Sequence, residues 1–267
     1  MSIQTLKSVT LDANLPSLRL DRSANDNTIL LLDGANQNGL PESVVNGSKL
    51  LDLSGNELDA EFVISNSKLS LLNGIKFADD NVTDYLKVPG LVAALTGKSF
   101  AVSVMYYRKA NPGGVSASVF GIGAGAGASL GLGFQPSSSQ QTFVRDTNDV
   151  QAFAETQWTN ASGSGYDIMV QLGLNVQIIG ADTLFEAYKQ NDDFTEPIKD
   201  GSSLEVGVQG VFASTVEANI GAVGSDSTPN FRGYICRIVI EDIETSGITA
   251  TEFLQREWDQ NRDRFAL

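Results

Sequence analysis

Short apolar stretches separated by turn residues run along the chain from residue 28 onward. The clearest stretch is 231–240; in another long one, 99–108, Phe100, Val102, Val104 and Tyr106 alternate with other residues and so share one face of a strand. Gly, Pro, Asn and Asp end most stretches, as turn residues do. By these criteria we expect strands at 28–32, 61–64, 74–77, 85–88, 99–108, 119–123, 130–134, 142–145, 150–154, 166–172, 176–179, 184–189, 204–207, 218–223 and 231–240.

One helix is expected, close to the C-terminus, over residues 249–262. Thr249 is a suitable N-cap, and Glu252 three positions later completes a capping box. Leu254 and Trp258 are four residues apart, so both would lie on the helix face that packs against a sheet. We therefore expect Trp258 to be a core residue.

The chain divides into two parts by pattern. Residues 1–27 show little periodicity and are interpreted as an N-terminal arm or edge segment, either a strand that closes the fold or an arm that docks on a partner. Residues 28–267 are expected to form one domain, because roughly 200–250 residues is a common size for a single all-β domain.

Composition narrows the function classes. The 267 residues include no histidine and one cysteine, which excludes His-dependent catalysis, disulfides within the chain and a thiolate zinc cluster. The formal net charge of −14 argues against nucleic acid as a partner. No apolar run reaches 18 residues and the first residues lack a signal-peptide pattern, so we expect neither membrane insertion nor a secretory signal. Cys236, within an apolar strand, is expected to be buried and unreactive.

The order of several motifs resembles the concanavalin A-like lectin/glucanase superfamily in its laminin-G-like form. Residues 85–89 (Tyr-Leu-Lys-Val-Pro) precede 95–106, which is similar to the family pattern Leu-Thr-x-x-Ser/Asp-Phe-x-Val-x-x-Tyr/Trp. Residues 231–240 are similar to the closing strand Phe-x-Gly-x-Ile-Asp-x-Val-x-Ile, and 51–56 to an Asp-x-Ser-Gly-Asn turn. The resemblance covers roughly residues 28–262.

This resemblance implies an all-β fold, a jelly-roll sandwich of two antiparallel sheets with one short C-terminal helix. Two departures from the family pattern stand out. Cys236 replaces the usual Asp of the closing strand, and residues 185–191 match the family's Tyr-x-Asn-Gly hairpin only loosely.

Catalysis is not expected. Glycosidases of this family carry carboxylates at alternate positions of one strand, and retaining hydrolysis requires two carboxyl groups about 5–5.5 Å apart. The nearest candidates, Glu241 and Glu244, would lie on opposite faces of a strand. We interpret the segment that contains them as a solvated turn.

Two loops contain candidate binding residues. Asp79, Asp80, Asn81 and Asp84 offer oxygen ligands of the kind calcium prefers, although ordinary turns have the same composition and no other cofactor is expected. A second loop, rich in Ser and Gly, offers an aromatic platform and hydrogen-bonding groups for a glycan. Its candidate residues are Gln157, Trp158, Asn160 and Tyr166, with a core position for Trp158 as the alternative.

The expected function is that of a non-catalytic structural or adhesion protein on the surface of a phage or phage-like particle. An adhesive fold without a visible export signal suits a particle that assembles in the host cytoplasm and leaves by lysis. Its partners would be other virion proteins or copies of itself, together with a cell-surface glycan. The alternative is a carbohydrate-binding module of a bacterial surface protein.

Overall fold

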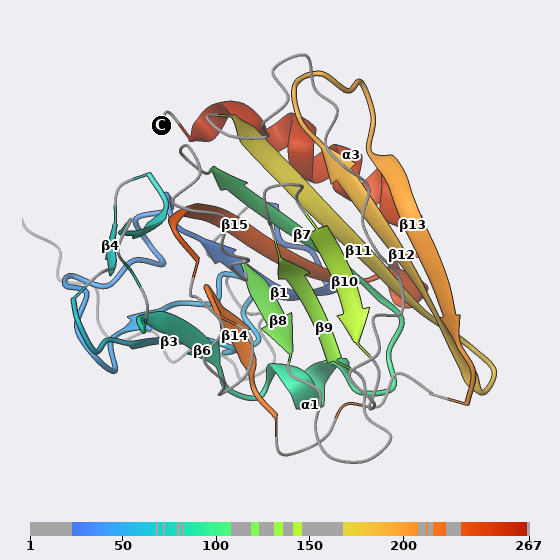
Figure 1. The fold of residues 1–267 in the computed structure, drawn as a ribbon, viewed down its shortest axis with the longest axis horizontal. Helices are drawn as coiled ribbons and strands as arrows, with labels where there is room; N and C mark the ends of the chain where they lie inside the picture. The colour runs from blue at the N-terminus through green and yellow to red at the C-terminus, as the bar shows by residue number, and fades with distance from the viewer. Residues whose placement is uncertain are drawn as a thin grey trace, which may run out of the picture.

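The computed structural model describes most of the chain, and all statements about its structure concern these parts. They are residues 23–107 without 68, 72, 79, 80 and 82, then 119–122, 131–135, 141–145, 168–207, 212, 216–222 and 231–265. Two antiparallel sheets stack face to face, and one helix covers the outer face of the larger sheet (Figure 1). This confirms the predicted all-β sandwich with a C-terminal helix. None of the helices in the described ranges is long and apolar enough to cross a membrane.

The larger sheet has eight strands and carries the site described below. Its order is β13 (Ile198–Glu205), β12 (Asp182–Gln190), β11 (Met169–Ile179), β7 (Phe100–Tyr107), β15 (Gly233–Asp242), β5 (Ile75–Phe77) and β4 (Leu69–Leu71). The eighth strand, β1 (Thr28–Asp33), also pairs with β15. Of the segments 166–172 and 176–179, predicted as two strands, residues 169–172 and 176–179 belong to the one long strand β11, and residues 166 and 167 lie outside the described residues.

The smaller sheet has seven strands, in the order β10 (Gln141–Arg145), β9 (Gly131–Gln135), β8 (Phe120–Ile122), β14 (Ala218–Ile220), β6 (Tyr85–Val88), β3 (Ala60–Val63) and β2 (Lys49–Leu50). β8 and β9 pair in antiparallel fashion, as two strands of a hairpin do. Two short helices were not predicted, α1 (Leu91–Leu95) and α2 (Ile243–Ser246). The predicted strand 150–154 lies outside the described residues.

The main core lies between the sheets, and strand alternation produces it. Phe100, Val102, Val104 and Tyr106 of β7 all point into this core, as their spacing predicts. The intervening Ala101 is also buried, but against the helix on the opposite face of the sheet. The larger sheet is therefore covered on both faces where the helix lies.

The helix α3 (Ala250–Asn261) packs on the outer face of the larger sheet (Figure 1). Its predicted capping box is present: Glu252 N donates to Thr249 Oγ1 at 3.2 Å, and Thr249 N donates to the Glu252 carboxylate at 2.8 Å. Leu254 and Trp258 are buried, which confirms the predicted core position of Trp258. Gly173 on β11 makes room for the helix, because a Cβ there would lie 2.3 Å from a methyl carbon of Leu254.

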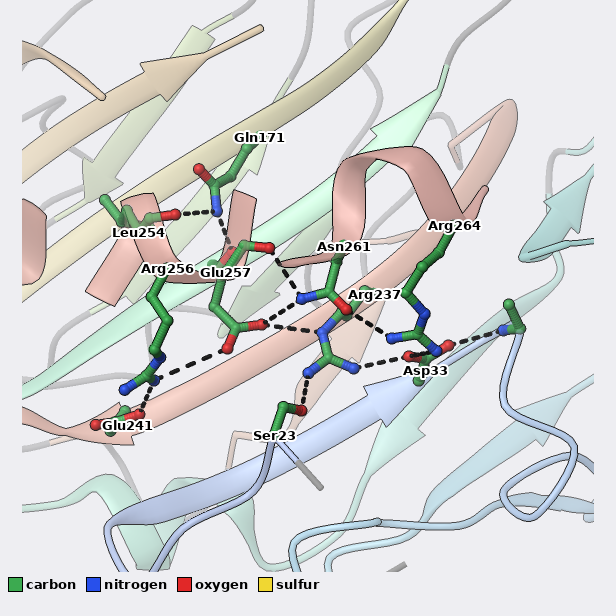
Figure 2. Close-up of polar contacts among 12 residues, drawn as sticks. Ser23, Asp33, Gln171, Arg237, Glu241, Leu254, Arg256, Glu257, Asn261 and Arg264 are labelled. Carbon is green, nitrogen blue, oxygen red and sulfur yellow. Dashed lines mark hydrogen bonds and ion pairs between the residues drawn. The ribbon is translucent and has the colours of Figure 1, made fainter. Parts of the chain in front are cut away.

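A buried network of charged groups also attaches α3 to the sheet (Figure 2). Arg237 of β15 donates to Asp33 of β1 at 2.7 Å and to Glu257 of α3 at 3.0 Å, and all three side chains are fully buried. Arg264, just after α3, makes a second ion pair with Asp33 at 3.0 Å. Arg237 also donates to the Ser23 hydroxyl at 2.6 Å. The network therefore joins β1, β15, α3 and the segment before β1.

Cys236 is buried beside this network, as predicted. Burial raises the pKa of its thiol, and the nearby negative charge of Asp33 raises it further. The thiol is therefore protonated at neutral pH and has little nucleophilic character.

The turn at residues 52–56 fixes β1 in place. The Asp52 carboxylate is buried and accepts hydrogen bonds from the backbone N–H groups of Leu31 at 3.0 Å and Ser54 at 3.0 Å. Asn56 Nδ2 donates to the carbonyls of Thr28 and Ile29. The motif that contributed to the family resemblance is therefore a structural brace in this protein.

Candidate functional site

A pocket of about 630 Å³ lies on the outer face of the larger sheet, between β11, β12 and the beginning of α3. Its volume is within the range typical of small-ligand sites. The sheet provides one side, and the turn between α2 and α3 provides the other. The lining residues are Ser99, Asn175, Gln177, Ile178, Glu186, Tyr188, Ile243, Glu244, Gly247, Ile248, Thr249, Ala250 and Thr251.

Strand alternation places the polar groups of this pocket. Asn175 and Glu186 are directly opposite each other in the register of β11 and β12. Their chain neighbours Val176 and Phe185 point the other way, into the core between the sheets. Because side chains alternate, Tyr188 lies two positions along β12 on the same outward face as Glu186.

Three donors hold the Glu186 carboxylate. Asn175 Nδ2 donates to Oε2 at 2.8 Å, and the Tyr188 hydroxyl donates to the same oxygen at 3.1 Å. Lys199 Nζ, from β13, donates to Oε1 at 3.0 Å. Burial acts to raise the pKa of Glu186, but the hydrogen bonds from Asn175 and Lys199, the Lys199 charge and the Tyr188 hydrogen bond together hold it below its usual value. Glu186 is therefore ionised at neutral pH.

Tyr188 has the opposite tendency. Burial raises the pKa of its hydroxyl to about 12, and the charge of Glu186 and the hydrogen bond to it act in the same direction. The hydroxyl therefore remains protonated at neutral pH and serves as a hydrogen-bond donor.

The remaining lining combines apolar surface with amide groups. Ile178, Ile243 and Ile248 provide the apolar part. Asn175 lines the pocket with its Nδ2 directed to Glu186, while its buried Oδ1 accepts no hydrogen bond from the residues that the structure describes. Burying a polar atom without a hydrogen-bond partner is costly. The hydrogen bond from Nδ2 to Glu186 is therefore the contact that orients the Asn175 side chain.

This arrangement suits binding better than proton transfer. An ionised carboxylate accepts hydrogen bonds, and a protonated phenol with a raised pKa is a poor acid and a poor nucleophile at neutral pH. A second carboxylate, Glu244, also lines the pocket from the first turn of α2, and its side chain is exposed.

The predicted solvated turn at Glu241 is wrong. Glu241 is the penultimate residue of β15, is 1% exposed and forms an ion pair with Arg256 of α3. Glu244 does not continue the strand, because Asp242 caps α2 through its side chain. Helix formation after Asp242 therefore separates the two glutamates, and the predicted placement on opposite faces of one strand does not apply.

The described part of the predicted calcium loop is used in local hydrogen bonding. The buried Asp84 carboxylate accepts from Ser65 N at 2.7 Å and Asn66 N at 2.9 Å. Asn81, also buried, donates to the carbonyls of Asp84 and Phe231. Asp79 and Asp80 lie outside the described residues. Within the described ranges, no group of three or more Asp, Glu or Cys side chains is placed to hold a metal ion, and calcium binding stays a prediction.

The predicted glycan-binding residues Gln157, Trp158, Asn160 and Tyr166 all lie outside the described residues, so their role also stays a prediction. Sequence reasoning did not identify the pocket at Glu186. The available signal was the alternation in β12, which puts Glu186 and Tyr188 on its polar face. That pattern does not reveal the contact with Asn175, 11 residues away on β11, or the contact with α3, which lies far away in the sequence.

No family model and no curated protein matches this sequence. Solved structures do match. The botulinum neurotoxin serotype D binding domain aligns with a TM-score of 0.53 at 11% identity, over 90% of this chain and 53% of its own. Domain 4 of an extracellular arabinanase from Geobacillus stearothermophilus, in complex with arabinotriose, aligns with a TM-score of 0.52 at 13% identity, over 81% and 92%.

Trypanosoma rangeli sialidase in complex with 2,3-difluorosialic acid aligns with a TM-score of 0.52 at 13% identity, over 89% of this chain. The present chain spans 34% of that sialidase chain. The protein is thus a distant structural match to concanavalin A-like lectin and sialidase-type β-sandwich domains. At these identities the likeness establishes the fold alone.

Proposed function

We propose that this chain is a carbohydrate-binding β-sandwich domain that does not itself catalyse a reaction. The observation that carries the proposal is the pocket beside α3, where an ionised carboxylate, amides and a hydroxyl lie next to three isoleucines. Sugars present hydroxyl groups and apolar C–H surfaces together. A pocket with a small number of fixed polar groups among apolar side chains is suited to such ligands.

The similar structures support this class of ligand. The arabinanase domain was solved with arabinotriose, and the sialidase with a sialic acid derivative. The toxin domain is described as a binding domain. These descriptions favour the carbohydrate-binding alternative over the particle-surface hypothesis, and no structure cited above is described as a phage protein. A virion location and virion partners stay predictions.

The absence of catalysis is supported by the pKa directions in the pocket. Glycoside hydrolysis uses one carboxylic acid whose pKa is raised so that it can protonate the leaving group. Glu186 has a pKa shifted the other way. A binding role therefore fits this residue better than that of a general acid.

The proposal is tested by blocking the pocket. Thr251, near the beginning of α3, lines it, so Thr251→Trp should fill part of the space. We expect this variant to bind oligosaccharides at least about tenfold more weakly than the wild type, measured on an immobilised panel of neutral and acidic glycans. Gln260→Trp adds the same side chain at an exposed position of α3 outside the pocket and should bind as the wild type does.

Two results would contradict the proposed site. Wild-type protein that binds no glycan of the panel would argue against carbohydrate binding. Glycan binding that survives Thr251→Trp but is lost in Trp158→Ala would instead place the site in the loop predicted from the sequence. Thermal unfolding of each variant shows whether its fold is retained.

A further inference from the structure

The charges around the pocket are unequal. Among the residues that the structure describes, two carboxylates line it, Glu186 from β12 and Glu244 from α2, and neither Lys nor Arg does. The nearest cation shown in contact with a lining group is Lys199, which pairs with Glu186 at 3.0 Å and is 53% exposed. A ligand carboxylate would therefore meet negative charge without a lining cation of its own.

The Glu186 carboxylate has capacity for one more donor. Its two oxygens offer about four acceptor positions. Oε2 accepts from Asn175 and Tyr188, and Oε1 accepts from Lys199. The side chain is 17% exposed, so part of it faces the solvent. A sugar hydroxyl can donate to the remaining position on Oε1, whereas an ionised sugar carboxylate has no proton to donate.

The beginning of α3 does not reverse this preference. A helix N-terminus attracts anions through its free N–H groups and its dipole. In α3 the capping box already places the carboxylate of Glu252 at this end, where it accepts from the backbone N–H of Thr249. The protein's own negative charge therefore complements the helix terminus.

We infer that the pocket selects neutral sugars, whose hydroxyls donate to Glu186, and rejects acidic sugars such as sialic and uronic acids. This inference rests on the proposed carbohydrate-binding function. It also distinguishes this protein's ligand class from the sialic acid derivative in the sialidase structure, of whose chain the present chain spans 34%.

The test compares neutral ligands with acidic counterparts: trigalacturonic acid has a carboxylate at C6 of each unit of galactotriose, and sialyllactose is lactose with one added sialic acid. Galactotriose with trigalacturonic acid, and lactose with sialyllactose, are titrated by calorimetry against the full chain. We expect the neutral member of each pair to bind at least about tenfold more tightly. Replacing Glu186 by Gln should weaken neutral binding about ten- to hundredfold, since a hydrogen bond to a charged group is lost. The same change should reduce the preference for neutral over acidic ligands.

A second variant should shift the preference the other way. Lys199→Gln removes the cation that pairs with Glu186, so discrimination against acidic ligands should increase. Glu196→Gln is the charge-matched control for Glu186→Gln, because Glu196 is exposed and does not line the pocket. It should leave both affinities unchanged.

The outcomes separate the two claims. Tighter binding of the acidic member of each pair, or an unchanged preference in both Glu186→Gln and Lys199→Gln, would overturn the inference while leaving carbohydrate binding intact. A complete lack of binding to neutral and acidic glycans would overturn the proposed function itself, and the inference with it.

Discussion

At the scale of single residues, the site depends on two side chains with opposite pKa shifts on one strand. Glu186 is held ionised by its donors, and Tyr188 is held protonated by burial and by that same carboxylate. Each group stabilises the charge state of the other. The pair is therefore a fixed acceptor and donor and not a proton-transfer couple.

The raised pKa of Tyr188 predicts a loss of stability at alkaline pH. Its pKa rises from about 10 in the unfolded chain to about 12 in the fold, so the folded state holds the proton more tightly. The stabilisation is complete below pH 10 and is lost as the pH rises toward 12. Over this interval the free energy of unfolding of the wild type should fall by about 1–3 kcal/mol more than that of Tyr188→Phe, which has no hydroxyl to titrate.

Urea unfolding of both proteins at several pH values measures this difference. Subtracting the two curves removes the contribution of the lysines and the other tyrosines, which titrate in both proteins. Parallel curves from pH 7 to 12 would show that the folded state does not hold the Tyr188 proton more tightly.

At the scale of elements, α3 forms one wall of the pocket, and its position depends on β1, β11 and β15. Gly173 lets Leu254 approach the sheet, and Arg237 connects Asp33 with Glu257. Removing Arg237 would leave Asp33 with only the partly exposed Arg264 and Glu257 with only the more distant Arg256, so two buried carboxylates would lose most of their compensation. Such a loss is much larger than the loss of a surface ion pair.

Arg237→Met should therefore destabilise the protein by about 3–5 kcal/mol, because Asp33 and Glu257 lose their shared cation. The matched control is Lys49→Met. Lys49 pairs with Asp59 at 3.4 Å, but its side chain is 60% exposed, so the change should cost less than about 1 kcal/mol. Denaturant unfolding measures both variants, and similar small effects for the two would show that the network does not hold α3.

Elements with a local pattern could be predicted from the sequence, and those that depend on distant partners could not. The alternation in β7 and the capping box of α3 are complete within a few residues, and both were predicted. β11 was predicted as two strands because Gly173 and Asn175 interrupt its apolar pattern. Gly173 makes room for Leu254, about 80 residues further along the chain. Asn175 faces the pocket and donates to Glu186, 11 residues away.

At the scale of the whole molecule, many short apolar stretches in the sequence predict the fold class, but the pocket forms only when the strands and α3 pack together. Glu186, Asn175 and Thr251 meet only when β12, β11 and α3 are packed together. The net charge of −14 gives the molecule a negative field, which acts in the same direction as the pocket's carboxylates against acidic ligands. Local and global charge thus both disfavour an acidic ligand.

The most direct test of this account is to map the bound sugar by NMR on isotope-labelled protein. Titration with the tightest-binding neutral oligosaccharide should shift backbone amide signals chiefly at residues 175–177, 186–188 and 249–251. Shifts concentrated at residues 157–166, or on the smaller sheet, with these three segments unaffected, would contradict it.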